Sequence, residues 1–212
     1  MFDWADRLSE NCLVCHAAVV EQNGRALLLV GKGGAGKSTL ALALVRRGFR
    51  YLGDEFAIVQ PAILEVLPFP KALCIKSSGV AMIPSPDPDF EVMAYPPNFS
   101  SRYKDALCCL PRKHIVPAPG ERFEIRWAIL LESESVSGSP AVVPRWEAAK
   151  SLYESSWQVG EEPFRAAAAL ARGARFWKMG RSDLAHMADW IEGLVDSDSA
   201  VMHSDRTKLR VE

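Results

Sequence analysis

Short apolar runs separated by turn residues occupy the first fifth of the chain. The runs over residues 12–20 and 26–30 flank Asn23-Gly24, a dipeptide typical of a tight hairpin turn. A glycine-rich stretch over residues 31–38 follows, and residues 38–47 then carry leucine and alanine at helical spacing. This pattern predicts a β-hairpin, a loop and a helix, in that order.

The segments after this helix predict short strands and then a region of different character. Gly48 supplies a helix stop, and the apolar segments 49–53, 56–60 and 63–67 are predicted as strands. Residues 68–120 contain most of the fourteen prolines, which rarely occupy helices or central strands. Long loops and edge strands are therefore expected there, with strands at residues 71–76 and 123–131.

The last third of the chain is predicted to be helical. Apolar residues recur at three- and four-residue spacing in segments 146–157, 163–172 and 183–195, and this spacing suggests that Trp146, Tyr153 and Trp157 belong to the core. Residues 196–212 are polar and lack periodicity, which predicts a frayed tail. The fold class is thus α/β with a helical C-terminal part, as one domain over residues 1–195 and a tail over 196–212.

Length and charge narrow the kinds of partner. A chain of 212 residues favours one domain, and 25 basic against 26 acidic residues lack the electrostatic footprint of a nucleic-acid or membrane-surface protein. No apolar run approaches the 18 to 20 or so residues that span a bilayer. The N-terminus does not resemble a secretory signal, so we expect a cytoplasmic protein whose five cysteines are free thiols.

The glycine-rich stretch is the strongest chemical signal in the sequence. It matches the phosphate-binding loop pattern, and it has the required strand before it and helix after it. In this motif backbone N–H groups form an anion-binding nest, the lysine reaches the β and γ phosphates, and the serine hydroxyl binds Mg²⁺. The sequence therefore predicts a nucleoside triphosphate, ATP in the leading hypothesis, bound with Mg²⁺ by Gly31, Lys32, Gly33, Gly34, Ala35, Gly36, Lys37, Ser38 and Thr39.

Two carboxylates and a histidine are predicted beside this loop. Asp54 lies 17 residues after Lys37, enough for a helix and a short strand that return to the phosphates. Asp54 can accept a proton from a hydroxyl, and Glu55 can join Ser38 and Asp54 as a Mg²⁺ ligand, unless the two carboxylates form only a solvated turn. His16, on the strand expected to pair with the loop strand, can support Asp54, although a core or surface histidine is the alternative.

The cysteines around His16 allow a second interpretation of that residue. Cys12-Leu13-Val14-Cys15-His16 matches the pattern for covalent haem attachment. The same segment is predicted as a strand beside a phosphate loop, and no export signal is indicated. We therefore favour His16 as a catalytic-site residue over haem binding.

The block from His16 through the glycine-rich loop to Asp54-Glu55 resembles the catalytic domain of the HPr kinase/phosphorylase family, whose fold is similar to ATP-dependent phosphoenolpyruvate carboxykinases. The resemblance covers about 45 residues. It implies that Lys37 binds phosphate, Ser38 binds metal, Asp54 accepts the proton, Glu55 is the second acidic residue and His16 is the family's histidine. Thr39 stands where the family usually has glutamate. Residues 67–71 and 143–146 look like shorter HPr-kinase-related proteins of peptide-modification clusters, among them serine kinases of lasso-peptide precursors.

The leading hypothesis is an ATP-dependent kinase that phosphorylates a serine hydroxyl of a peptide or small protein. A small-metabolite kinase of the shikimate-kinase type and a nucleotide-binding accessory ATPase are the alternatives, and a homo-oligomer stays open. The loops over residues 84–120, whose backbone the prolines restrict, are expected to bind the acceptor. Six cations are candidates for a second phosphate contact or for acceptor binding: Lys76, Arg102, Lys104, Arg112, Lys113 and Arg126.

Overall fold

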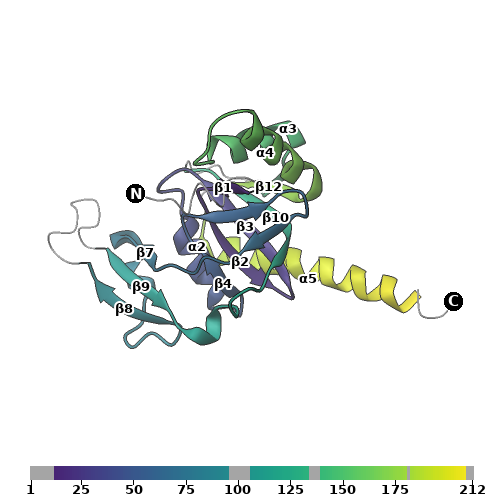
Figure 1. The fold of residues 1–212 in the computed structure, drawn as a ribbon. Coiled ribbons are helices and arrows are strands. Elements are labelled where there is room, and N and C mark those ends of the chain that lie inside the picture. The colour runs from purple at the N-terminus through teal and green to yellow at the C-terminus, as the bar shows by residue number, and fades with distance from the viewer. Residues whose placement is uncertain (1–11, 96–105, 134–138, 181, 209–212) are drawn as a thin grey trace.

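The computed structural model describes residues 12–95, 106–133, 139–180 and 182–208, which form a large mixed sheet with helices on both faces and a smaller sheet beside it (Figure 1). The large sheet contains β1 (Leu13–Cys15), β2 (Ala17–Gln22), β3 (Arg25–Gly31), β4 (Arg50–Gly53), β5 (Ala57–Gln60), β6 (Glu65–Leu67), β10 (Phe123–Leu131), β11 (Ala141–Val142) and β12 (Arg175–Met179). The helices are α2 (Lys37–Val45), α3 (Arg145–Glu154), α4 (Glu161–Gly173) and α5 (Leu184–Lys208), with 3₁₀ turns η1 (Ser77–Met82) and η3 (Lys113–Ile115).

Strand direction brings four carboxyl ends to one edge of the large sheet. The main path runs β1-β5-β6-β10-β3-β2-β4, and β12 also pairs with β10. β10 is parallel to both β3 and β12. β2 is antiparallel to both β3 and β4, so β4 runs in the same direction as β3. The segments that follow β3, β4, β10 and β12 therefore emerge together, which is where open α/β sheets bind ligands.

Both faces of the large sheet are covered, which explains the unbroken apolar run of its central strand β3. Leu27 and Leu29 pack in the cluster that includes α2 and α5, whereas Ala26, Leu28 and Val30 pack in the cluster that includes α3 and α4. Figure 1 shows these two pairs of helices on opposite sides of the sheet. In a strand that is buried on both faces, apolar and polar residues do not alternate along the sequence.

The structure confirms the local order expected from the first 60 residues. Asn23 and Gly24 both have positive φ, 57° and 79°, at the hairpin between β2 and β3. The predicted helix and the strand that leads to Asp54 correspond to α2 and β4. The mixed α/β class predicted from the sequence agrees with this architecture.

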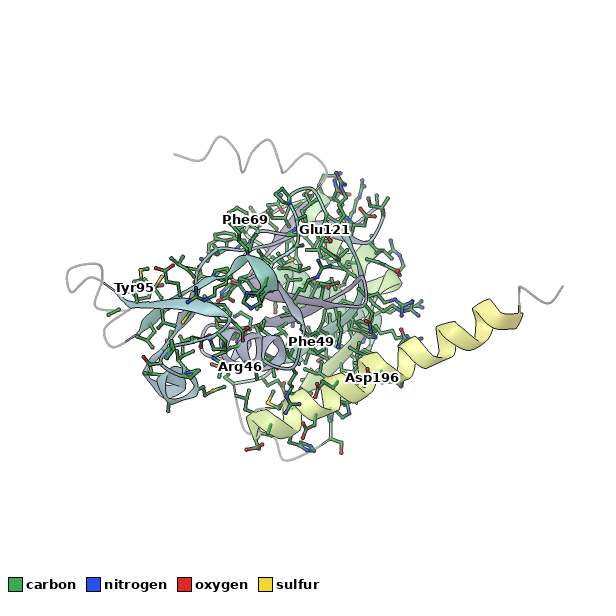
Figure 2. The ribbon with its side chains drawn as sticks, turned by 90° about the horizontal axis from the view of Figure 1, so that it is seen from below. Arg46, Phe49, Phe69, Tyr95, Glu121 and Asp196 are labelled. Carbon is green, nitrogen blue, oxygen red and sulfur yellow. The ribbon has the colours of Figure 1, made fainter. Side chains whose placement is uncertain are left out.

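The proline-rich segment builds a separate sheet, which the sequence did not predict. β7 (Leu73–Ile75) and β8 (Phe90–Ala94) both pair with β9 (Leu107–Pro111), in the order β7-β9-β8. Figure 2 shows Tyr95 at the end of this sheet that points away from the rest of the protein. At the other end Asp87, which is buried, forms an ion pair with Arg46 just after α2. The sheet is thus attached to the C-terminal end of α2.

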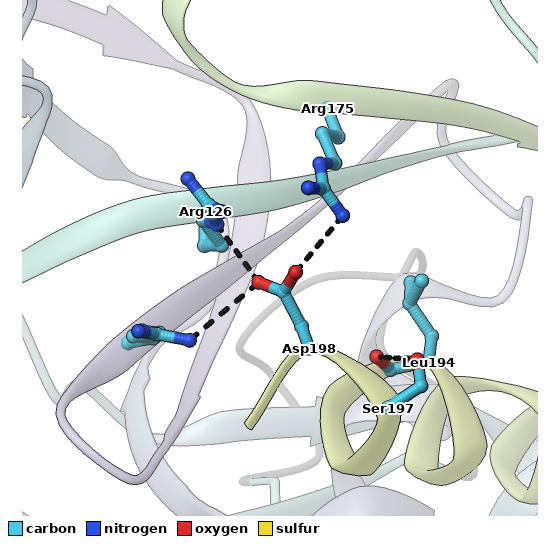
Figure 3. A network of polar contacts seen from close by, with 6 residues as sticks. Arg126, Arg175, Leu194, Ser197 and Asp198 are labelled. Carbon is cyan, nitrogen blue, oxygen red and sulfur yellow. Dashed lines mark hydrogen bonds and ion pairs between the residues drawn. The ribbon is translucent and has the colours of Figure 1, made fainter. Parts of the chain in front are cut away.

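The prediction of a frayed tail from Asp196 onward is wrong for residues 196–208, because α5 extends to Lys208. Asp198 is only 5% exposed and accepts contacts from Arg126 at 2.8 Å, Arg175 at 2.9 Å and Arg25 at 3.5 Å (Figure 3). The arginines come from β3, β10 and β12, far from Asp198 along the chain, so local sequence could not reveal them. No helix in the described ranges is both long and apolar enough to cross a membrane.

We expect Asp198→Ala to destabilise the fold, because it leaves three arginines facing one another without their carboxylate. The arginine side chains are 15% to 53% exposed, so we expect about 2 kcal/mol, between the values for exposed and buried ion pairs. This corresponds to a Tm lower by roughly 4–8 °C. Asp196→Ala, at an exposed position on the same helix, is the control. Equal Tm values for the two variants would contradict the assignment.

Candidate functional site

The glycine loop, residues 31–38, connects the end of β3 to the first turn of α2. Gly34 and Gly36 have φ of 89° and 96°, a left-handed conformation that side chains with a Cβ rarely adopt. At Gly31 a Cβ would lie 2.6 Å from the carbonyl oxygen of Leu131 on β10. The glycines therefore serve two needs: backbone conformation at the end of the loop and close strand packing at its start.

The Lys37 side chain folds back over this loop. Its Nζ donates hydrogen bonds to the carbonyl oxygens of Gly31 at 2.7 Å and Lys32 at 3.2 Å, and the residue is 6% exposed. Burial lowers the pKa of Lys37, while the charge of Asp54 acts in the opposite direction. The Lys37 ammonium is thus held against the start of the loop.

Ser38 and Asp54 meet at the edge of the sheet. The Ser38 hydroxyl donates to Oδ2 of Asp54 at 2.8 Å, and Asp54 is only 2% exposed. The second oxygen, Oδ1, is buried and has no hydrogen-bond partner among the described residues. Burial raises the pKa of Asp54, and the Ser38 hydrogen bond partly opposes this. A buried carboxylate oxygen without a partner fits a site completed by a cation or a proton.

Glu55, which follows Asp54, has a cation as its partner in the structure. Glu55 has a positive φ of 67°, and its carboxylate forms an ion pair with Lys71. The Lys71 ammonium also lies 5.3 Å from the centre of the Phe56 ring. Of the three predicted metal ligands, Ser38 and Asp54 are therefore brought into contact, whereas Glu55 is held by a lysine. Within the described ranges no three His, Cys, Asp or Glu side chains form a metal-binding cluster.

His16 lies beside the site, half-buried between β1 and β2. Its backbone N–H donates to the Ser155 carbonyl oxygen at 2.7 Å. Burial and the nearby charge of Lys37 lower the pKa of the imidazole, while Glu55 raises it less. The preceding Cys15 is fully buried and its pKa is raised to about 12, which does not suit haem attachment.

Trp157 is exposed beside His16, although helical spacing suggested that it belongs to the core. α3 ends at Glu154, so the helical pattern does not extend to Trp157, which is 62% exposed. Its ring stacks on Phe56 at 5.4 Å and meets the His16 ring edge-on at 6.0 Å. The core prediction is wrong for Trp146 as well, which is 69% exposed.

A cavity of about 560 Å³ opens between the glycine loop and α3, and we call it the α3 cavity. The ends of β3, β10 and β12 contribute to it together with polar side chains of α3. Its lining residues are His16, Val30, Gly31, Lys32, Gly33, Leu130, Leu131, Glu132, Ser133, Glu147, Ser151, Glu154, Ser155 and Lys178. The sequence did not predict this cavity, because its walls come from separate segments and carry no motif beyond the loop itself.

The cations predicted to contact phosphate or the acceptor lie in different parts of the structure. Lys76 is near the loop: its charge contributes to the lowered pKa of Lys37, and η1, which follows it, approaches Thr39. Arg126 belongs instead to the Asp198 network.

Arg112 and Lys113 do not reach the glycine loop. The Arg112 N–H donates to the Asp89 carbonyl oxygen at 2.9 Å, close to the Asp87 carboxylate that pairs with Arg46. They therefore lie near the C-terminal end of α2, roughly 13 Å along the helix from the loop. Arg102 and Lys104 fall outside the described residues.

The chain is similar to known proteins in structure and not in sequence. No protein-family model matches the chain, and no curated protein does. The structure is similar to that of the HPr(Ser) kinase/phosphatase from Coxiella burnetii, with 12% sequence identity and a TM-score of 0.42. The match covers 94% of this chain and 98% of the other.

Proposed function

We propose that this protein is a kinase that transfers the γ-phosphoryl group of ATP to a serine hydroxyl of a peptide or small protein. One observation carries the proposal: the Ser38 hydroxyl of the glycine loop contacts the buried Asp54 carboxylate at 2.8 Å, with Lys37 over the same loop. A phosphate-binding motif beside a buried carboxylate combines the two functions that phosphoryl transfer needs, charge neutralisation and a proton acceptor.

The residues would divide this work as follows. The loop N–H groups and Lys37 bind the phosphates, because both present positive charge to the same place. Ser38 and Asp54 would hold Mg²⁺, which neutralises phosphate charge when bound, in keeping with its preference for few carboxylates together with phosphate oxygens. We assign His16, whose pKa is affected by the charges of Lys37 and Glu55, a supporting role for Asp54.

Asp54 also suits the role of general base. Burial raises the pKa of its carboxyl, which makes the carboxylate a better proton acceptor than an exposed aspartate. In the proposed step the acceptor O–H gives its proton to Asp54 while an oxygen–phosphorus bond forms. The bond from the γ-phosphorus to the bridging oxygen breaks, and ADP leaves.

Serine as the acceptor rests on the resemblance of the His16-to-Glu55 block to HPr-kinase-like proteins. Incubation with ATP, Mg²⁺ and a panel of serine peptides, followed by mass spectrometry, tests it. We expect phosphopeptide to accumulate, and the same peptide with alanine in place of serine to remain unmodified. Phosphate released only into solution would indicate an accessory ATPase, and modification only of free metabolites a small-metabolite kinase.

A further inference from the structure

We infer that the α3 cavity is the acceptor site and that it selects a serine flanked by a basic residue. This inference rests on the proposed kinase function. It moves the acceptor away from the loops over residues 84–120, where the sequence suggested it, because Arg112 and Lys113 lie near the far end of α2.

The position of Lys37 shows which end of a bound triphosphate faces the cavity. The lysine of such a loop reaches the β and γ phosphates, and here its Nζ lies on the carbonyl oxygens of Gly31 and Lys32. Gly31, Lys32 and Gly33 also line the α3 cavity. On the other side of the loop, Thr39 is approached by η1, where a Cβ on Gly79 would lie 3.6 Å from the Thr39 hydroxyl. The phosphoryl group to be transferred would thus face the cavity.

The size and floor of the cavity suit a segment of peptide. Its volume of about 560 Å³ is within the 300–1,000 Å³ or so of typical ligand sites. Val30, Leu130 and Leu131 supply apolar surface, and Ser151 and Ser155 add hydroxyl groups on the α3 side. Apolar surface with a few polar groups can hold the stem of a long side chain while its charged end is recognised.

The α3 side of the cavity carries more carboxylates than cations. Glu132 and Glu147 share the single ammonium of Lys178, at 3.0 and 3.1 Å. Among the described residues, the ion-pair partner of Glu154 is Lys150, at 3.8 Å between two side chains that are each more than 60% exposed, a contact that contributes little. The glycine loop, with the cation Lys32, also lines the cavity, and bound phosphate would neutralise its charge. This arrangement attracts a basic group to α3 and repels a carboxylate.

An exposed aromatic surface next to the cavity reinforces the preference for a basic group. Trp157 and Phe56 stack at 5.4 Å, and Trp157 contacts His16, which lines the cavity. The Lys71 ammonium lies over the Phe56 ring, 5.3 Å from the ring centre, so this surface already binds one cation. Trp157 is 62% exposed, and an indole is the ring type that attracts guanidinium and ammonium groups most strongly.

The test uses serine peptides that differ only in the flanking residues, arginine in one set and glutamate in the other. With the wild-type protein we expect kcat/KM at least about tenfold higher for the arginine peptides, mainly through a lower KM. Glu154→Lys should remove or reverse this preference while leaving the KM for ATP unchanged. The control is Glu162→Lys, the same change at an exposed α4 position that does not line the cavity.

The outcomes separate the inference from the function on which it rests. If no peptide is phosphorylated, the proposed function is wrong and the inference falls with it. If peptides are phosphorylated without regard to flanking charge, or Glu154→Lys behaves like Glu162→Lys, the inference alone is overturned. A raised KM for ATP in Glu154→Lys would also overturn it, because the cavity would then hold the nucleoside.

Discussion

Replacing Lys37 by alanine is expected to reduce phosphoryl transfer by about 10³-fold or more, the scale on which a cation that stabilises transferring phosphate acts. The Lys37 ammonium donates hydrogen bonds to the carbonyl oxygens of Gly31 and Lys32, which hold it against the backbone of the loop. Steady-state formation of phosphopeptide measures the loss. Tm should change little, because the ammonium donates its hydrogen bonds to carbonyl oxygens of a surface loop.

Lys32→Ala is the matched control for this prediction. Lys32 belongs to the same loop, but its side chain is exposed, and its carbonyl oxygen, which Lys37 uses, is kept in the variant. We expect Lys32→Ala to retain most of the transfer rate. Unchanged transfer in Lys37→Ala would refute the interpretation of the loop as a phosphate site.

The second large effect is expected for Asp54→Asn, which should lose roughly 10²-fold or more in transfer while nucleotide binding persists. Asparagine keeps the shape and can still accept the Ser38 hydrogen bond, but it cannot take the proton of the acceptor hydroxyl. Transfer is measured on peptide, and binding by titration with a fluorescent ATP analogue. A parallel loss of both would show that Asp54 acts through Mg²⁺ binding alone and that the general base lies elsewhere.

The same variant should be more stable than the wild type when no ligand is bound. Burial raises the pKa of Asp54, so its ionised form costs stability above that pKa, and the cost disappears as the pH falls and the carboxyl is protonated. Asparagine removes the charge. At neutral pH we therefore expect Tm, measured by thermal denaturation, to rise. The gain should shrink in acid, and a Tm decrease at neutral pH would contradict it.

Local sequence was sufficient for the first part of the site. The Asn23-Gly24 turn, the glycine loop and the strand before Asp54 all follow one another within about 40 residues, and each has its own turn or cap chemistry. The contact between Ser38 and Asp54 follows from one helix and one strand of expected length. The structure therefore contains this part of the site nearly as the spacing predicts.

The rest of the site depends on pairings that local sequence does not encode. β12 was not predicted, because Phe176 and Met179 are buried three residues apart, without the alternation of a half-buried strand. Asp198 looked like part of a polar tail because its arginine partners come from three distant strands. The α3 cavity has the same origin, since Lys178 of β12 and Glu147 of α3 meet only after the sheet is assembled.

The parallel pairing of β3 with β10 also has a consequence for biosynthesis. Leu29 and Ile129 are direct neighbours in the sheet although 100 residues separate them in the chain. A ribosome adding about 5–20 residues per second needs roughly 5–20 s to make that interval. During this time the β2–β3 hairpin exists without the strand that covers one of its edges, and the apolar run of residues 26–30 is exposed to other nascent chains. Co-translational holding by a chaperone should therefore raise the soluble yield of this protein.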